Sequence, residues 1–326
     1  MRVKMLGMGR FYTIVKMRAP PDLEALSLAE AFAVLVPRHE LAAQVSRALA
    51  EDLGAAGDVT SAALVPAAAR ARAVVRSRAA GTLAGMPVAL ETVAQAAPQV
   101  RARALRQDGE RLAPQDAVLE LEGPLRGILA AERTLLNYLC HLCGVATLAA
   151  TFVAATRGTR ARICDTRKTM PGLRLLEKYA VRCGGGTSHR IGLFDAMLVK
   201  DNHIADIPLT QLGARLAAAA ASARAAAPLR FVEVECDSLE QLRVLLALPA
   251  GTVDMALLDN MPPEQLAEAV RLRDAHAPAM LLEASGGVRL ETVARIAAAG
   301  VDRISVGALT HSAPALDLGL DIAPTA

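Results

Sequence analysis

Basic side chains are concentrated in one stretch of the chain, residues 165–203, which also contains three consecutive glycines. Six cations in this stretch surround the glycines within 34 residues: Arg167, Lys168, Arg174, His189, Arg190 and Lys200. Arginine binds carboxylate and phosphate through parallel hydrogen bonds, and lysine supplies a compact point charge. A solvated surface is the usual explanation of such a run, but these residues adjoin Gly-rich turns and expected strand ends. We therefore predict a site for a small molecule with several negative charges.

Two acidic positions further along the chain could complete this site. In Val232-Glu233-Val234-Glu235-Cys236, the alternation of a strand places both glutamates on one face, and Asp259 directly follows an apolar run at residues 255–258. Mg²⁺ usually binds one or two carboxylates together with substrate phosphates. Glu235 and Asp259, placed opposite Lys and Arg, therefore predict Mg²⁺ shared with a diphosphate, although a structural ion pair is the simpler alternative for each carboxylate.

Glycines follow the last two apolar runs, at Ser285-Gly286-Gly287 and at Gly307. Backbone amides that no side chain covers form anion sites when they precede a helix. Barrels of alternating strands and helices often bind phosphate in their last two loops. We predict that Ser285, Gly286, Gly287 and Gly307 bind a phosphate group.

The elements that position these residues are short apolar runs alternating with helical segments. The runs end at Asp165, Lys200, Glu235, Asp259, Ser285 and Gly307, between 22 and 35 residues apart. A strand–helix unit needs about 20–35 residues with its loops. Six units are too few for a closed eight-stranded barrel. The fold class is therefore predicted as α/β, with an open, irregular α/β barrel over residues 136–312.

A smaller α+β sandwich domain is predicted before the barrel, over residues 1–135. Residues 27–53 have helical spacing, residues 57–61 resemble a turn, and residues 70–122 are rich in strand patterns. A helix is predicted from Glu132 to Thr147, with Leu135, Leu139 and Leu142 on one apolar face. The first 18 residues hold five basic and no acidic residues, and no long apolar segment follows them. Residues 1–25 are thus expected to be a disordered extension and not a signal peptide.

Composition limits the classes of partner. Aromatic residues make up 2% of the 326, with no Trp, which disfavours base stacking on nucleic acid. A net charge of +3 is too mild to indicate a nucleic-acid or membrane partner, and no apolar run in the sequence reaches the length of a membrane span. The five cysteines are odd in number and scattered, which favours a reducing cytoplasm over a disulfide framework.

The sequence closely resembles the quinolinate phosphoribosyltransferase family from about residue 40 onward. The segments that carry the resemblance are Glu51-Asp52-Leu53, Gly57-Asp58-Val59-Thr60, Glu132-Arg133-Thr134-Leu135-Leu136-Asn137, Asp165-Thr166-Arg167-Lys168-Thr169, Pro171-Gly172-Leu173-Arg174, Glu177-Lys178-Tyr179-Ala180-Val181, Lys200-Asp201-Asn202-His203, Leu258-Asp259-Asn260, Glu283-Ala284-Ser285-Gly286-Gly287 and residues 305–312. The resemblance implies transfer of phosphoribosyl from phosphoribosyl pyrophosphate to quinolinate with loss of CO₂. It also implies that the tail at residues 313–326 returns to the first domain.

The resemblance further implies a homodimer whose active sites are shared between chains, a hexamer of dimers being the larger alternative. Arg133 of one chain would join the groups of the other that hold quinolinate and phosphates, namely Arg167, Lys168, His189, Arg190 and Lys200. Glu235 and Asp259 would face ribose and Mg²⁺, and Ser285, Gly286, Gly287, Gly307 and His311 would surround the 5′-phosphate. Lys168, Lys200, Glu235 and Asp259 are the expected catalytic residues.

Three residues depart from the family pattern, and three other functions stay open. Cys143, Met170 and Ser188 replace the usual Ser, Thr and Asn, and none of these changes removes a charge. The chain could instead use nicotinate, which lacks the 2-carboxylate, although the density of Arg and Lys favours the dicarboxylate. It could be a paralogue from a molybdenum-transport setting that shares this architecture. It could also be a sensor that binds a phosphate ligand without turnover, although a sensor has no need of both Glu235 and Asp259.

Overall fold

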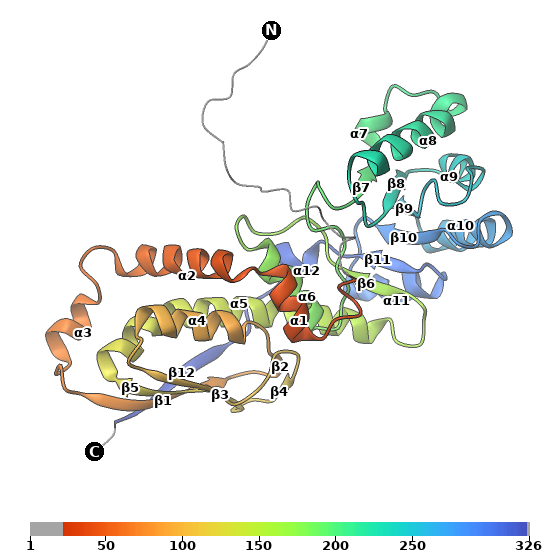
Figure 1. The fold of residues 1–326 in the computed structure, drawn as a ribbon. Coiled ribbons are helices and arrows are strands. Elements are labelled where there is room, and N and C mark those ends of the chain that lie inside the picture. The colour runs from red at the N-terminus through yellow and green to blue at the C-terminus, as the bar shows by residue number, and fades with distance from the viewer. Residues whose placement is uncertain (1–21, 325–326) are drawn as a thin grey trace, which may run out of the picture.

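The structure, a computed structural model, describes residues 22–324. Most of the extension expected at residues 1–25 therefore lies outside the described residues. The chain forms two lobes joined by one long helix, α5 (Leu125–Ala155), as Figure 1 shows. The last strand, in blue, returns to the lobe built from the first part of the chain.

The first lobe is a four-stranded antiparallel sheet with helices packed beside it. Its elements are α1 (Leu28–Leu35), α2 (Arg38–Leu53), α3 (Val59–Leu64), β1 (Arg70–Ser77), β2 (Gly81–Thr82), α4 (Met86–Ala96), β3 (Arg101–Ala104), β4 (Arg111–Leu112), β5 (Ala117–Pro124) and the C-terminal β12 (Leu318–Pro324). The strand order is β12-β1-β5-β3, and β2 pairs with β4 separately. Alternation along β1 buries Ala71, Ala73 and Val75 on one face, so its sequence specifies a sheet with one buried side.

Local structure in this lobe differs from the sequence expectation at three places. Residues 27–53 form two helices, because Pro37 lacks the backbone N–H that would continue the first one. The turn predicted at residues 57–61 is wrong in part: Asp58 caps helix α3 by accepting the N–H of Ser61 at 2.9 Å. Within the strand-rich segment lies helix α4, which starts after Gly85 in a left-handed conformation.

Helix α5 is longer than the helix predicted from Glu132 to Thr147, with 31 residues. The proposed division of the domains at residues 135 and 136 falls inside it, because one continuous helix serves the cores of both lobes. By length and composition alone, α5 could cross a membrane, contrary to the statement that no apolar run is long enough. Half of its most apolar window is buried against the rest of the protein, however, as is typical of a core helix.

The second lobe is a six-stranded parallel sheet surrounded by helices. Its elements are β6 (Arg162–Cys164), α6 (Arg174–Cys183), β7 (Met197–Val199), α7 (Asp201–Ile204), α8 (Leu209–Ala226), β8 (Val232–Cys236), α9 (Leu239–Leu246), β9 (Met255–Asp259), α10 (Pro263–His276), β10 (Leu281–Ser285), α11 (Leu290–Ala298), β11 (Arg303–Ser305) and α12 (Ala308–His311). The strand order is β6-β11-β10-β9-β8-β7, so β6 and β7 are the edges of the sheet and do not pair. The predicted α/β class and open barrel are thereby confirmed.

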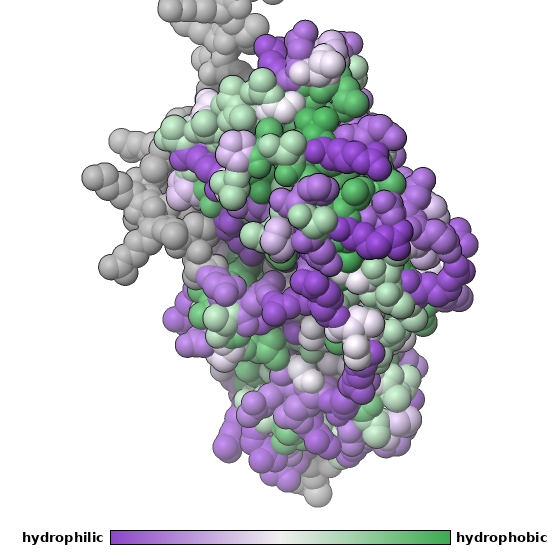
Figure 2. Space-filling model, turned by 90° about the vertical axis from the view of Figure 1, so that its right-hand side faces the viewer, coloured by the Kyte–Doolittle hydropathy of each residue, from purple (hydrophilic) through white to green (hydrophobic). Residues whose placement is uncertain are grey.

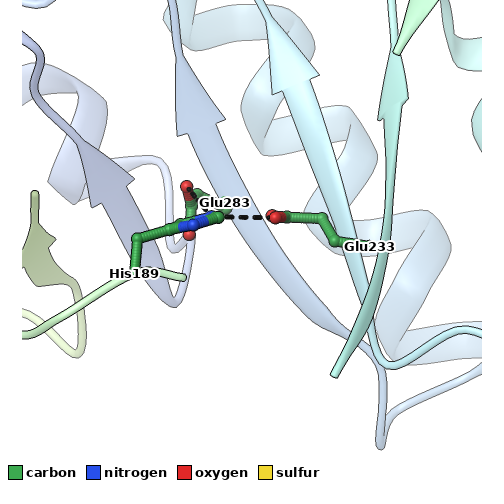
Figure 3. A group of neighbouring side chains, drawn as sticks. All are labelled: His189, Glu233 and Glu283. Carbon is green, nitrogen blue, oxygen red and sulfur yellow. Dashed lines mark hydrogen bonds and ion pairs between the residues drawn. The ribbon is translucent and has the colours of Figure 1, made fainter. Parts of the chain in front are cut away.

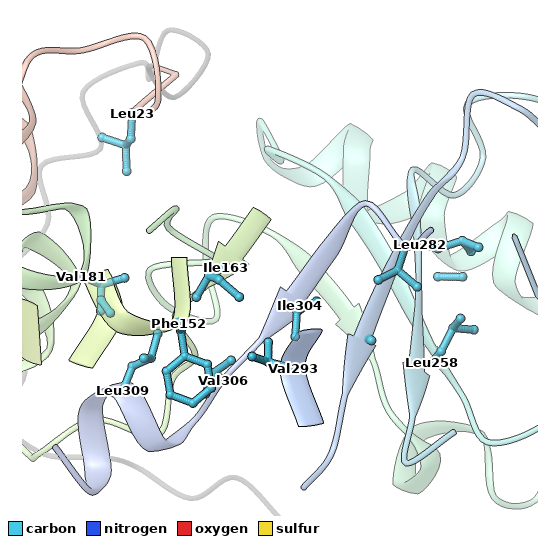
Figure 4. Packing of buried hydrophobic residues seen from close by; sticks show 14 of the residues in the cluster. Leu23, Phe152, Ile163, Val181, Leu258, Leu282, Val293, Ile304, Val306 and Leu309 are labelled. Carbon is cyan, nitrogen blue, oxygen red and sulfur yellow. The ribbon is translucent and has the colours of Figure 1, made fainter. Parts of the chain in front are cut away.

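Aliphatic side chains hold the barrel strands to the helices outside them. Ile304 of β11, Leu282 of β10 and Leu258 of β9 are buried, and Val293 of α11 and Phe152 of α5 belong to the same cluster (Figure 4). Such runs of buried aliphatic residues are typical of parallel strands covered on both sides. The outward side of the helical layer is mostly hydrophilic, with apolar residues interspersed (Figure 2). The core therefore fixes the strands, and their ends carry polar residues.

Candidate active site

A cavity of about 730 Å³ opens at the carboxyl ends of the barrel strands. Parallel strands all end at the same edge of their sheet, so residues far apart in sequence meet there. The predicted site residues that line this cavity are Arg167, Lys168, His189, Arg190, Lys200, Glu235, Asp259, Ser285, Gly286, Gly287, Gly307 and His311. Of the predicted site residues, Arg133 alone is outside this lining, and of the predicted basic cluster, Arg174 is too.

One side of the cavity carries cations without counter-ions. Within the described residues, the side chains of Arg167, Lys168 and Arg190 form no hydrogen bond or ion pair. Arg167 is half-buried with its Nε shielded from solvent, and Arg190 is buried. Burial and, secondarily, the nearby charge of Arg167 lower the pKa of Arg190. Charged groups are rarely buried without a partner, so this side of the cavity is prepared to bind an anion.

The loop that carries Arg167 and Lys168 is fixed from two sides. The hydroxyl of Thr310 donates to the carbonyl of Lys168 at 2.6 Å. The buried carboxylate of Glu177 on α6 accepts the N–H of Met170 at 3.1 Å and lies 2.8 Å from His141 Nε2. The two loop cations therefore project from a backbone that the rest of the protein holds in place.

A fully buried ion pair supports the segment that carries His189 and Arg190. Lys178 on α6 pairs with Asp165 at the end of β6, and both side chains are buried completely. The same Asp165 oxygen accepts the N–H of His189 at 2.9 Å. The carbonyl of His189 accepts a hydrogen bond from Arg230 at 3.0 Å. These contacts position the start of the loop that presents Arg190.

His189 lies against two buried carboxylates at the base of the cavity (Figure 3). Its Nε2 lies 2.8 Å from Glu233 on β8 and 3.3 Å from Glu283 on β10. Burial opposes a charge on the ring, whereas the two carboxylates favour it and raise the pKa of His189. Burial likewise raises the pKa of Glu283, yet His189 and Arg303 bring it down to about 2. Because Nδ1 accepts the backbone N–H of Arg190, the proton that these three side chains share lies between Nε2 and the carboxylates.

Another part of the cavity lining is acidic. Glu235 at the end of β8 forms an ion pair with Lys200 from the end of β7. Asp259 at the end of β9 accepts a hydrogen bond from the Asn260 side chain at 2.6 Å. Oxygens of Glu235, Asp237 and Asp259 lie within 4.8 Å of one another, a spacing that a cation could bridge. Carboxylate oxygens are ligands that Mg²⁺ prefers, so these residues fit the ion that the sequence predicts.

The glycine loops bring bare backbone to the third side of the cavity. Gly286 has φ +91°, and a Cβ there would lie 2.3 Å from Asn260 Oδ1, so no other residue fits without movement. At Gly307, a Cβ would lie 3.0 Å from Lys168 Cδ and 3.1 Å from His311 Nε2. The phosphate loop predicted at Gly307 thus adjoins both Lys168 and His311.

The residues of this site or its metal cluster that sequence reasoning missed include Asp237, Asn260, Glu283 and Arg289. Glu283 is an inward-facing charge within the apolar strand β10, a signal that the sequence did carry. Asn260 follows Asp259 with φ +54°, and Arg289 begins α11 after the glycine pair. Asp237, Asn260 and Arg289 follow the ends of β8, β9 and β10, and this placement would have identified them as candidates.

Arg133 is exposed on α5 and lies outside the cavity. Within residues 22–324 its side chain has no hydrogen-bond or ion-pair partner. The single chain therefore does not bring Arg133 into its own site.

Comparison with known proteins adds a family to this geometry. Residues 58–143 match the N-terminal domain of quinolinate phosphoribosyl transferase, and residues 145–321 match its C-terminal domain. The nicotinate-nucleotide pyrophosphorylase [carboxylating] of Mycobacterium leprae is 46% identical over 280 residues, covering 85% of this chain and 95% of that protein. The human protein of the same name is 38% identical, covering 90% of this chain and 95% of its own length.

A solved structure agrees with these sequences. The nicotinate-nucleotide pyrophosphorylase from Francisella tularensis superimposes with a TM-score of 0.79 at 36% identity, covering 88% of this chain and 98% of that chain. The two-lobed fold, the polar cavity at the strand ends and both domain matches lead to one conclusion. This chain belongs to the quinolinate phosphoribosyltransferase family.

Proposed function

We propose that the chain transfers phosphoribosyl from phosphoribosyl pyrophosphate to quinolinate, with decarboxylation, to give nicotinate mononucleotide, pyrophosphate and CO₂. One observation carries the proposal: Arg167, Lys168 and Arg190 face the cavity without counter-ions in the described structure. Quinolinate has two adjacent carboxylates, and phosphoribosyl pyrophosphate is more strongly charged. The missing counter-ions are then the substrates themselves.

Binding sets up the reaction by placing two anionic substrates in one site. Arg167 and Arg190 would hold the carboxylates of quinolinate, and the amides at Gly286, Gly287 and Gly307 would hold phosphate with Ser285 and His311. Fixing both partners aligns the pyridine nitrogen with the anomeric carbon of ribose, which replaces a bimolecular encounter by a step within one complex.

The acidic side of the cavity suits the charge that develops on the sugar. As the bond to pyrophosphate breaks, positive charge grows on the ribose, and Glu235 and Asp259 would stabilise it. Lys168 and Lys200 would balance the negative charge that grows on the leaving group. Once its nitrogen is alkylated, the pyridine ring is cationic and stabilises the electron pair that CO₂ leaves at carbon 2. Protonation of this ylide carbon then gives nicotinate mononucleotide.

Mg²⁺ is the proposed cofactor, held by Glu235 and Asp259 with Asp237 beside them. The ion would supply positive charge to the diphosphate of the substrate. Because Lys200 already pairs with Glu235, the carboxylate is oriented before any ion arrives.

A homodimer with shared active sites is part of the proposal. Arg133 is exposed and partnerless in the described chain, on a helix that lies away from the cavity. A second copy could supply this residue to the first copy's quinolinate site and so complete it. The reducing cytoplasm is the proposed location, in keeping with the five cysteines, all of which are free.

The test is a product assay with substrate discrimination. Pure protein, quinolinate, phosphoribosyl pyrophosphate and Mg²⁺ should give nicotinate mononucleotide and an equal amount of CO₂. Nicotinate should have a far lower kcat/KM, because it leaves cavity cations unpaired, a loss on the order of 10²-fold or more. Comparable kcat/KM for the two acids would contradict the dicarboxylate specificity, and binding without product would favour a sensor.

A further inference from the structure

Both ring nitrogens of His189 are occupied within the protein. Nε2 lies 2.8 Å from Glu233 Oε2 and 3.3 Å from Glu283 Oε1. Nδ1 accepts the backbone N–H of Arg190 at 2.8 Å. Imidazole has only these two polar atoms. A ligand in the cavity could therefore bond to His189 only if one of these contacts broke.

The rest of His189 is fixed as firmly as its ring. Its N–H donates to Asp165, and its carbonyl accepts from Arg230. The ring of Phe231 meets the imidazole edge to face, with centroids 5.2 Å apart. Glu283 is in turn held by Arg303, whose Nε lies 2.8 Å from Glu283 Oε2. A rotation of the ring that released a nitrogen toward the cavity would break these contacts.

Arg190, the next residue, has a side chain that is free to bind a ligand. The guanidinium of Arg190 has no hydrogen-bond or ion-pair partner in residues 22–324, and it lines the cavity. What is fixed is its backbone, through the bond from its N–H to His189 Nδ1. His189 thus connects a buried charge group to the residue best placed to bind a carboxylate.

We propose that His189 is a positioning residue that couples Glu233 and Glu283 to the backbone of Arg190, and that it does not itself bind substrate. The ring carries its proton on Nε2, where the carboxylates share it, because Nδ1 accepts a hydrogen bond. His189 consequently donates no proton to the substrate. The inference rests on the proposed function for its kinetic assay, although its structural part stands apart from that function.

A double-mutant cycle separates positioning from direct binding. The variants are His189→Gln, Arg190→Ala and the double variant, with kcat/KM for quinolinate as the readout. We expect Arg190→Ala to lower kcat/KM by about 10²-fold or more, and His189→Gln to lower it by about 10-fold. If His189 acts only through Arg190, the double variant should lie within about threefold of Arg190→Ala. A double variant reduced by the product of both factors would overturn the proposal.

The cycle has its own controls for folding. His276→Gln changes an exposed histidine on α10 outside the cavity and should leave kcat/KM unaltered. Should His189→Gln fail to fold, His189→Asn replaces it, because its shorter side chain places an amide oxygen near the site of Nδ1. A wild-type protein without turnover would refute the proposed function and not this inference.

Nitrogen NMR then tests the inference without any turnover. In the ligand-free protein labelled with ¹⁵N histidine, His189 should show a protonated Nε2 and an unprotonated Nδ1. The His189 signals are those missing from the His189 variant. Benzene-1,2-dicarboxylate, which has the two carboxylates of quinolinate without the ring nitrogen, should leave that pattern in place. A proton on Nδ1 in the free protein, or one gained on adding the dicarboxylate, would overturn the proposal.

Discussion

Charged side chains at the mouth of the barrel, where the cavity opens, differ in their partners from charged side chains buried at its base. At the mouth, Arg167, Lys168 and Arg190 have no counter-ion among the described residues, whereas the half-exposed Lys200 pairs with Glu235. At the base, Lys178 pairs with Asp165, and Arg303 and His189 pair with two buried glutamates. A buried charge is tolerated only when it is compensated. An ion pair that is fully buried therefore supports the fold, and a cation without a partner at the mouth marks the place where a charged ligand binds.

The largest expected effect concerns the acidic side of the mouth. Removal of divalent ions with a chelator should reduce activity by at least ~10³-fold, and added Mg²⁺ should restore it, because Glu235, Asp237 and Asp259 are spaced for a shared cation. The melting temperature should change little, since Lys200 already pairs with Glu235. Full activity in excess chelator would remove Mg²⁺ from the mechanism.

Loss of a cation at the mouth should impair activity and spare stability. Arg167→Ala should lower kcat/KM for quinolinate by about 10²–10³-fold, since charge-assisted hydrogen bonds contribute roughly 1.5–3 kcal/mol each. Its free energy of unfolding should stay within about 0.5 kcal/mol of wild type, because no partner is left unpaired. Arg295→Ala, which removes an exposed arginine paired with Glu264, is the matched control and should affect neither quantity. A large loss of stability in Arg167→Ala would abolish the contrast between mouth and base.

At the base, the same kind of change should act on stability. Lys178→Met leaves Asp165 buried without its cation, and should lower the free energy of unfolding by about 3–5 kcal/mol, measured by urea denaturation. The double variant Lys178→Met with Asp165→Asn should recover much of the loss, because the introduced asparagine is neutral and could still accept the N–H of His189. Equal stability of Lys178→Met and wild type would show that the pair is dispensable.

The smallest expected signal, a partial recovery of activity, tests whether a cation from outside the cavity completes the site. Arg133→Ala and Lys200→Ala homodimers should each be nearly inactive if sites are shared. Refolding the two together in equal amounts makes half of the dimers hybrids, each with one intact site, so activity should recover to roughly a quarter of wild type. Hybrids that form but recover nothing would place Arg133 in its own chain's site.

The amino-acid sequence by itself determined the series of strand ends. Apolar runs at helix–strand spacing placed Asp165, Lys200 and Glu235 at one edge of a sheet, because side-chain periodicity and chain length are local properties. The same reasoning overlooked α4 and α3, where short helices depend on capping and packing more than on periodicity.

Only the tertiary structure decided which charges are compensated. Glu283 joins His189 across nearly a hundred residues, and Lys178 reaches Asp165 from a helix that follows it. No pattern in the sequence distinguishes paired Lys178 from unpaired Lys168, ten positions earlier. The difference is set by burial and by which strands and helices meet, because electrostatic energy depends on distance and local polarity rather than on order along the chain.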